Sequence, residues 1–262
     1  MAIFFIIGND NRTINIKEML EKEKKITEDI KEAGYIYCGI PFSKDGENIT
    51  GTDIACDDVI NVCKNKTLIS GGISKQIRRR LEDEKIKYYD VMDMDEIATL
   101  NAIPTSEGAI QIAMENTDTT LNDSNILVLG FGKIGKILSK MLQGIGANVY
   151  CEARNQKDLA LIKAMGYNKV NLKELDNYLS QFDVIFNTIP DMILDSFRLD
   201  KIKKTCVIID LASSPGGTDF EYAKKIGITA RLELGLPSRV AAKSATKYIK
   251  EAIDTIVTND MN

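Results

Sequence analysis

Residues 125–135 read Asn-Ile-Leu-Val-Leu-Gly-Phe-Gly-Lys-Ile-Gly, and this stretch decides the fold. Apolar residues lead directly into Gly130, Gly132 and Gly135, and an amphipathic run follows. A short buried strand, a glycine turn and the start of a helix form, in this order, the dinucleotide-binding fingerprint. The first glycine allows the tight turn, the second lets the backbone approach a pyrophosphate, and the third lets the helix pack on the strand. The stretch predicts a nucleotide site, with a Rossmann-like domain that binds no nucleotide as the alternative.

The composition argues against several other classes of protein. The chain has 262 residues, of which 44% are hydrophobic and 27% charged, as is usual for a globular protein. Its formal net charge of −4 argues against a nucleic acid or an anionic membrane as the main partner. No apolar run approaches the roughly 20 residues that span a membrane. The apolar start of the chain lacks the basic flank of a signal peptide.

The chain contains no histidine and five scattered cysteines. Without imidazole, proton transfer falls to carboxylates, lysine, tyrosine or water. With no histidine and no clustered thiols, we expect no metal site. An odd number of cysteines without the spacing of a disulfide framework indicates reduced thiols and a cytoplasmic protein.

Short apolar runs alternate with helical patterns along the whole chain. This alternation predicts an α/β fold of two Rossmann-like domains with parallel sheets, the second of them a doubly wound NAD(P)-binding domain. The expected strands are 3–7, 35–40, 67–70 and 86–89, then 126–129, 147–153, 169–170, 184–187, 206–210 and 228–232. The expected helices are 14–31, 54–63, 73–81 and one that starts at 93 or 97 and ends at 115, then 134–143, 158–165, 172–180, 220–226 and 238–257.

A polar stretch at 115–120 carries turn-forming residues and predicts the domain boundary. We expect a substrate or partner domain at 1–118 and a nucleotide-binding domain at 119–262. The last helix follows the final strand, so its packing back on the first domain is a second possibility.

The end of the second strand after the glycine turn indicates which dinucleotide binds. An NAD site carries an acidic residue there for the ribose hydroxyls, and Glu152 is a candidate. Ala153 followed by Arg154 suits the 2′-phosphate of NADP instead, because arginine makes charge-assisted hydrogen bonds to phosphate. We therefore expect NADP(H) in preference to NAD(H), with Arg154 as an ordinary solvated charge as the alternative. The expected cofactor-binding residues are Gly130, Phe131, Gly132, Lys133, Ile134, Gly135, Ala153, Arg154, Asn155, Asn187, Thr188, Ile189, Pro190, Leu211, Ala212 and Ser213.

Prolines and short polar residues follow several expected strand ends in the second half, where parallel sheets bind their ligands. We expect Pro190, Pro215 and Pro237 to stiffen these loops for binding, and Ser213 and Ser214 to offer donors near a nicotinamide. The alternative is that loops after strands simply carry proline. Gly217 in the same loop could begin a helix close to a carboxylate, with a plain glycine turn before a helix as the alternative.

Arginine, lysine and hydroxyl side chains supply the candidates for substrate binding. Arg239 and Lys243 are spaced to share one face of the last helix and could anchor an anionic substrate, although surface charge is the commoner fate. Arg12 follows the first strand, where such a domain exposes its binding loop. Thr105 or Ser106 is expected to cap a helix, to bind a carboxylate, or to do both.

Together these motifs resemble, along essentially the whole chain, the family of the first subunit of dipicolinate synthase. The similarity rests on residues 8–12 (Gly-Asn-Asp-Asn-Arg), 101–108, 130–135, 153–154, 187–190, 210–217 and 234–241. The run at 210–217 is also similar to a loop of alanine dehydrogenases and transhydrogenases. Asn9 departs from the glycine of the family pattern, which leaves the conformation of this loop open.

The resemblance implies NADP-dependent oxidation of a CH–CH bond, from dihydrodipicolinate to dipicolinate, in the mother cell of a sporulating bacterium. It also implies a partner, the flavoprotein-like second subunit of dipicolinate synthase, and is compatible with a homo-oligomer. Aromatisation helps to drive the loss of hydride, so the protein needs mainly to orient the ring, anchor two carboxylates and accept a proton.

For that reaction we assign Arg239, Lys243 and Arg12 to the carboxylates, and Thr105, Ser106 and Ser214 to substrate orientation; no proton acceptor is assigned. The alternatives are an oxidoreductase of another oxo or hydroxy acid and a non-catalytic nucleotide-binding scaffold. The missing histidine counts against a 2-hydroxyacid dehydrogenase, which needs an acid–base imidazole.

Overall fold

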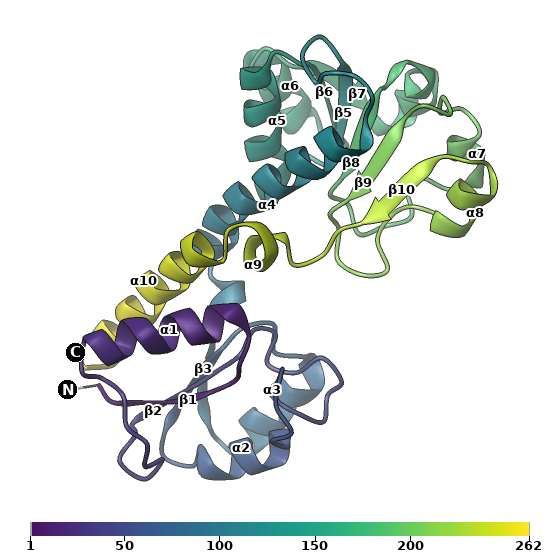
Figure 1. Cartoon of the computed structure of the whole chain (residues 1–262). Coiled ribbons are helices and arrows are strands. Elements are labelled where there is room, and N and C mark those ends of the chain that lie inside the picture. Colours follow the sequence, from purple (N-terminus) through teal and green to yellow (C-terminus); the bar gives the residue numbers. More distant parts are fainter. Residues whose placement is uncertain (1, 262) are drawn as a thin grey trace. The chain divides into compact units, whose positions relative to one another are not determined.

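The computed structural model describes residues 2–261, which fold into two compact units (Figure 1). Unit 1 comprises Met1–Asn101 and Ala241–Asn262, and unit 2 comprises Ala102–Val240. These divisions differ from the expected boundary after residue 118. Helix α4 (Asp95–Asn116) runs through the first division, so the polar stretch behind it is a connection inside unit 2.

Unit 1 is built on a parallel sheet in the order β1-β2-β3-β4. Its strands are β1 (Phe4–Ile7), β2 (Tyr35–Cys38), β3 (Thr67–Ser70) and β4 (Lys87–Asp90). An isolated parallel bridge also joins Phe4 to Ile26, and Phe4 N–H donates to the carbonyl of Lys25 at 2.8 Å. With this bridge counted as a rudimentary strand, the order becomes 2-1-3-4-5, the flavodoxin-like doubly wound sheet.

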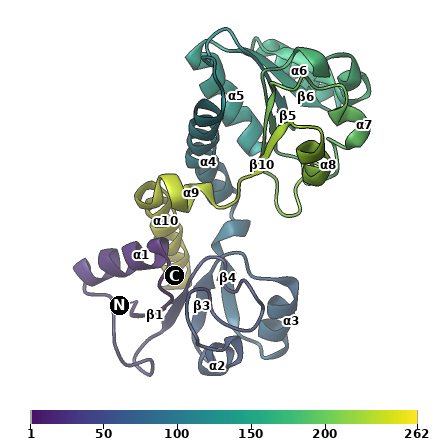
Figure 2. The same cartoon turned by 45° about the vertical axis from the view of Figure 1, so that its right-hand side comes forward.

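Helices cover both faces of this sheet, as that winding requires (Figure 2). Helices α1 (Asn11–Lys22) and α10 (Ala242–Met261) pack together on one face, where Ile16, Ile249 and Ile253 join the core. Helices α2 (Cys56–Val62) and α3 (Lys75–Asp83) cover the other face, and the turn η1 (Val91–Asp93) follows β4. The last helix therefore packs in unit 1, the second of the two placements considered from the sequence. The first helix ends at Lys22, well short of the expected residue 31.

Unit 2 contains the predicted doubly wound parallel sheet, in the order β10-β9-β8-β5-β6-β7. Alternate residues of β5 face opposite sides: Ile126 and Val128 pack on one side, and Leu127 and Leu129 on the other. The strands are β5 (Asn125–Leu129), β6 (Asn148–Ala153), β7 (Asn168–Asn171), β8 (Val184–Asn187), β9 (Val207–Asp210) and β10 (Thr229–Leu232).

The helices of unit 2 differ from the sequence expectation in three places. The segment 172–180 forms two 3₁₀ turns, η2 (Leu172–Asn177) and η3 (Leu179–Gln181), whose buried apolar residues are few. Helix α7 (Ser196–Leu199) was missed because one turn gives no periodic signal. The expected helix at 238–257 is interrupted, because a separate short helix, α9 (Leu236–Val240), precedes α10. The other helices are α5 (Lys133–Ile145), α6 (Gln156–Ala164) and α8 (Phe220–Lys225).

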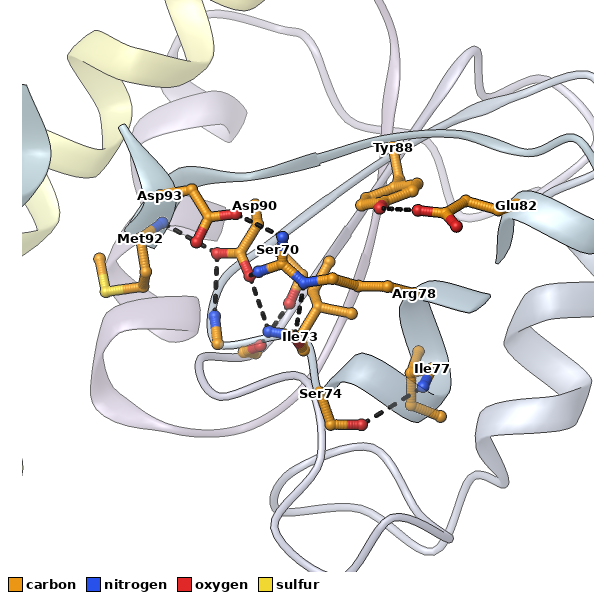
Figure 3. Close-up of polar contacts among 12 residues, drawn as sticks. Ser70, Ile73, Ser74, Ile77, Arg78, Glu82, Tyr88, Asp90, Met92 and Asp93 are labelled. Atoms are coloured by element: carbon orange, nitrogen blue, oxygen red, sulfur yellow. Dashed lines mark hydrogen bonds and ion pairs between the residues drawn. The ribbon is translucent and has the colours of Figure 1, made fainter. Parts of the chain in front are cut away.

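A buried carboxylate holds the turn after β3 in unit 1 (Figure 3). Asp90 accepts hydrogen bonds from the backbone N–H groups of Gly72 and Ile73 at 2.9 and 2.8 Å. Arg78 of α3 donates to the same carboxylate and to Asp93. One side chain at the end of β4 thus ties together a glycine turn, a helix and the following turn.

Replacing Asp90 with alanine should lower the free energy of unfolding by about 3 kcal/mol, because it leaves buried donors and a guanidinium without their acceptor. Glu84→Gln is the matched control, since Glu84 pairs with Lys64 at 2.9 Å with both side chains about half exposed. Such pairs contribute at most about 1 kcal/mol. Urea unfolding followed by circular dichroism measures both variants, and equal losses would contradict this role of Asp90.

Candidate functional site

The glycine turn between β5 and α5 is closed by packing at two glycines and open at the third. Gly130 has φ +90°, and a Cβ there would lie 2.5 Å from Thr188 Oγ1. A Cβ on Gly135 would lie 2.0 Å from the carbonyl oxygen of Gly130. At Gly132, by contrast, no atom of residues 2–261 beyond the adjoining residues lies within 4 Å of the position of a Cβ. The protein itself therefore requires the first and third glycines, whereas the second leaves space beside the backbone.

That space adjoins the N-terminus of α5. Gly132 is the N-cap residue of this 13-residue helix and, as a glycine, makes no side-chain cap hydrogen bond. The N–H groups of a helix N-terminus, with the helix dipole, bind phosphates. The turn thus fits the pyrophosphate of a dinucleotide, because it combines donors with open space.

A pocket of about 430 Å³ lies beside this turn at the carboxyl ends of β5, β6 and β8. It brings together nine predicted cofactor residues from three loops: Gly130, Phe131, Gly132, Ala153, Arg154, Asn155, Thr188, Ile189 and Pro190. Its lining also contains Glu152, which was the candidate for the ribose hydroxyls of NAD, and Asp158 and Asp191, which were not among the predicted site residues. The remaining predicted cofactor residues, which are Lys133, Ile134, Gly135, Asn187, Leu211, Ala212 and Ser213, are not in its lining.

Arg154 is the basic residue of this lining, and it already has an acidic partner. Its Nη2 lies 3.1 Å from Asp191 Oδ2, and both side chains are more than half exposed. A pair so exposed is worth at most about 1 kcal/mol, so a more highly charged anion can replace the carboxylate. Asn155 caps α6 by accepting the N–H of Asp158 at 2.8 Å, which is a structural role. The position of Asp191 directly after Pro190 was the sequence signal that could have identified it.

Glu152 lies buried beneath the glycine turn. Its Oε2 accepts the N–H of Gly130 at 3.2 Å, and its Oε1 is buried without a hydrogen-bond partner among residues 2–261. Burial raises the pKa of Glu152, and the bond from Gly130 opposes this only in part. This carboxylate therefore stabilises the turn through a buried hydrogen bond to the backbone of Gly130.

Ionisation of Glu152 should cost stability, because its pKa is higher in the folded chain than in the unfolded one. Stability is lost as the pH rises from the ordinary glutamate range through the raised native pKa. Glu152→Gln keeps an acceptor for Gly130 and removes the charge. We expect the variant to melt at a higher temperature than the wild type at about pH 8, and the difference to vanish at about pH 4.

Glu18→Gln, on the exposed side of α1, is the control and should show no such pH-dependent difference. A Glu152→Gln chain that melts below the wild type at both pH values would contradict the buried-charge interpretation.

A second buried carboxylate joins the loops that follow β8 and β9. Asp210 Oδ2 accepts hydrogen bonds from Gly217 N–H at 2.9 Å, Thr218 Oγ1 at 2.7 Å and Asn187 Nδ2 at 3.0 Å. Its Oδ1 accepts the N–H of Ala212 at 3.1 Å. Asn187 in turn accepts the N–H of Ile189 at 3.1 Å. Leu211, Ala212 and Ser213 are thus held beside the pocket by a residue to which the sequence had assigned no role.

Gly217 lies in the loop before a helix, the second of the two possibilities considered from the sequence, because α8 begins at Phe220, after the N-cap residue Asp219. Its backbone donates to Asp210, and a Cβ on Gly217 would lie 2.4 Å from the carbonyl oxygen of Asp191. The glycine is needed for close approach between the two loops.

The predicted capping role of Thr105 and Ser106 is wrong. Both residues lie inside α4, which begins at Asp95 and continues through Pro104. The hydroxyl of Ser106 is buried and donates to the carbonyl of Ala102 at 2.7 Å, so its hydrogen bond is made within its own helix. Ser214, by contrast, is exposed in the loop between β9 and α8.

Arg239 and Lys243 do not share a helix face, because the chain is interrupted between α9 and α10. Arg239 is exposed in unit 2, and its Nη1 lies 2.7 Å from Glu233 Oε2. Lys243 is exposed in unit 1. Arg12, also in unit 1, is largely buried and donates to the carbonyl of Ile40.

In the part of the chain that the structure describes, no helix is long and apolar enough to cross a membrane. Nor do residues 2–261 contain three potential metal ligands grouped as a site. All five cysteines are buried and unbridged, and burial raises the pKa of the Cys151 and Cys206 thiols to about 12.

Comparison with known proteins identifies unit 2. Residues 101–215 match the family described as D-isomer specific 2-hydroxyacid dehydrogenase, NAD binding domain. The first subunit of dipicolinate synthase from Bacillus subtilis (strain 168) is 38% identical over 191 residues, which are 72% of this chain and 64% of that protein. The match therefore spans less than two thirds of that relative's length. Unit 2 is a nicotinamide-dinucleotide-binding domain of the dehydrogenase type.

Two further similarities extend over more of the relative. The crystal structure of the same dipicolinate synthase subunit from Bacillus halodurans has a TM-score of 0.90 and 27% identity, and the alignment covers 97% of each chain. Shikimate dehydrogenase (NADP(+)) of Methanosphaera stadtmanae is 26% identical over 222 residues, which are 74% of each chain.

The open space at Gly132 makes a direct prediction for cofactor binding. Gly132→Ala should leave the melting temperature nearly unchanged but weaken NADPH binding about tenfold or more, because the methyl group occupies space meant for phosphate. Gly135→Ala is the contrasting variant and should destabilise the fold by its contact with Gly130. NADPH fluorescence titration and thermal melting measure the two effects; wild-type affinity in Gly132→Ala would exclude a pyrophosphate at this turn.

Proposed function

Because the chain belongs to the family of the first subunit of dipicolinate synthase, we propose that it oxidises dihydrodipicolinate to dipicolinate with NADP⁺. The observation that carries the proposal is the glycine turn, open for a pyrophosphate, in a chain that is similar to that family over 97% of its length. The proposal includes a partner, the flavoprotein-like second subunit, and a role in the mother cell during sporulation.

The reaction removes one hydride and one proton from the dihydropyridine ring, and the product is aromatic. A bound nicotinamide dinucleotide supplies the hydride acceptor. The chain has then to place the ring and exclude alternative orientations, which requires fixed loops more than reactive side chains. Asp210 and Asn187 fix the loops after β8 and β9, where the nicotinamide half of a dinucleotide lies in such sheets. The chain has no histidine, so the proton leaves through a carboxylate, a lysine, a tyrosine or water.

NADP is the proposed cofactor, and Arg154 is the proposed ligand of its 2′-phosphate. Arg154 lies in the pocket lining next to Ala153, and its exposed partner Asp191 is weakly held. A phosphate carries more charge than a carboxylate and accepts a bidentate pair of hydrogen bonds from arginine. The relative from Methanosphaera stadtmanae is named as an NADP(+) enzyme, which is consistent with this choice.

Arg154→Gln should weaken NADPH binding about tenfold or more and leave NADH binding nearly unchanged, because only NADPH carries the 2′-phosphate. Asp191→Asn is the matched partner variant; by freeing Arg154 it should strengthen NADPH binding alone. Fluorescence titration with both nucleotides measures the change. Equal affinities of the wild type for NADH and NADPH would overturn the cofactor assignment.

The activity is tested by following NADPH and dipicolinate absorbance with purified chain, dihydrodipicolinate and NADP⁺ or NAD⁺, with and without the second subunit. We expect equal amounts of dipicolinate and NADPH. No rate above background in any combination would exclude the dehydrogenase. Nucleotide binding without turnover would favour the scaffold alternative, and turnover of another oxo or hydroxy acid would favour the other oxidoreductase.

A further inference from the structure

Two arginines share one buried carboxylate at the end of β10 in unit 2. Glu233 Oε1 lies 2.9 Å from Arg231 Nε, and Glu233 Oε2 lies 2.7 Å from Arg239 Nη1. The side chain of Glu233 is 6% exposed, whereas those of Arg231 and Arg239 are 51% and 54% exposed. Arg231 Nη1 also donates to Asn116 Oδ1 at 3.2 Å. A buried anion thus holds two half-exposed cations in fixed positions.

This arginine pair carries a net positive charge that Glu233 does not cancel. Burial disfavours the ionised carboxylate, but hydrogen bonds from Arg239 and Arg231 outweigh burial and lower the pKa of Glu233. The cluster therefore contains one negative and two positive charges at neutral pH. Each guanidinium has five N–H donors, so donors remain on both exposed side chains after the bonds to Glu233 and Asn116.

The arginine pair lies next to the loop that Asp210 organises. Glu233 N–H donates to the carbonyl of Asp210 at 2.8 Å, and Leu232 is in register with Asp210 across the β9–β10 pair. A Cβ on Gly216 would lie 3.1 Å from Leu232 Cδ1, so the loop packs on the end of β10. The two cations are thus beside the carboxyl edge of the sheet, where parallel α/β domains bind their ligands.

We propose that Arg231 and Arg239, fixed by Glu233, form a binding site for a carboxylate group of the substrate. The proposal rests on the proposed function, and it deepens that function by adding Arg231 and Glu233 to Arg239, which the sequence had already assigned to a substrate carboxylate. In this arrangement Glu233 is a positioning residue and the two guanidiniums are the ligands. Preorganised arginines suit a rigid dicarboxylate because their side chains lose little conformational entropy on binding.

The competing interpretation is a purely structural clamp that holds α9 against β10. A clamp predicts that loss of either arginine lowers stability and leaves carboxylate binding unchanged. A binding site predicts that loss of either arginine weakens carboxylate binding and changes stability less. The two interpretations therefore differ in a measurement of binding that needs no turnover.

The test measures dipicolinate binding to the full-length chain with saturating NADPH by isothermal titration calorimetry. The variants are Arg231→Gln and Arg239→Gln. Arg231→Lys and Arg239→Lys are added because they retain the positive charge and can be measured if the Gln variants fold poorly. Lys203→Gln is the control, because Lys203 pairs with Asp183 at the opposite, amino edge of the same sheet and loses the same charge. Thermal melting and NADPH titration accompany each variant.

We expect each Gln variant to bind dipicolinate about tenfold more weakly or worse, with NADPH affinity retained, and each Lys variant to recover part of the loss. Lys203→Gln should bind as the wild type does. Wild-type binding in both Gln variants, or no dipicolinate binding by the wild type, would overturn the carboxylate site.

Failure of the proposed function has a different signature. If the wild type binds dipicolinate through the two arginines but oxidises no dihydrodipicolinate, the function fails and the site stands. If the wild type turns over and both Gln variants keep its KM and affinity, the site fails and the function stands.

Discussion

The carboxylate of Asp210 is the interaction on which the cofactor edge of unit 2 depends. It is fully buried at the end of β9 and accepts hydrogen bonds from both neighbouring loops. A buried carboxylate without donors is costly, so the fold is stable only when both loops supply them. The loops at 188–191 and 211–218 must therefore converge. The walls available to a nicotinamide converge with them. Gly217 is part of the same constraint, since only a residue without a side chain lets the loops meet.

The glycine turn adds a second constraint, and a hydrogen bond to a buried carboxylate stabilises it. Gly130 and Gly135 are required by contacts within the protein, and the buried carboxylate of Glu152 accepts the N–H of Gly130. Gly132 alone is free of such contacts, which is why it indicates a ligand and its neighbours do not. The pocket beside the turn has more acidic than basic residues, so a phosphate there depends on Arg154 and on the N-terminus of α5.

The features that were predicted correctly from the sequence are local. The glycine turn and all six strands of unit 2 could be predicted because apolar runs and glycine spacing reflect short-range geometry. The segment 172–180 was mispredicted because its leucines mimic a helical repeat that the structure realises as 3₁₀ turns. Helix α4 was expected to carry a cap at Thr105 or Ser106, yet it continues through Pro104 because packing, at Ala102 and Ala109 for example, outweighs local preference.

The partner of Arg154 could not be predicted, because Asp191 lies on a separate loop, after β8. That pairing is set by the order of the strands, which brings distant carboxyl ends to one edge. Glu233 is near Arg231 and Arg239 in the sequence, but its contact with both depends on the turn between β10 and α9, which carries no periodic pattern. Sequence spacing placed Arg239 with Lys243 on one helix, whereas the structure separates them into different units.

The central claim is that a nicotinamide dinucleotide binds at this edge of unit 2, with its pyrophosphate at Gly132. Hydrogen–deuterium exchange of the full chain with and without saturating NADPH tests it most directly. The account predicts slower exchange at 131–136, 188–191 and 211–217, and unchanged exchange in β1 to β4. Protection absent from these three segments, or concentrated elsewhere, would contradict it.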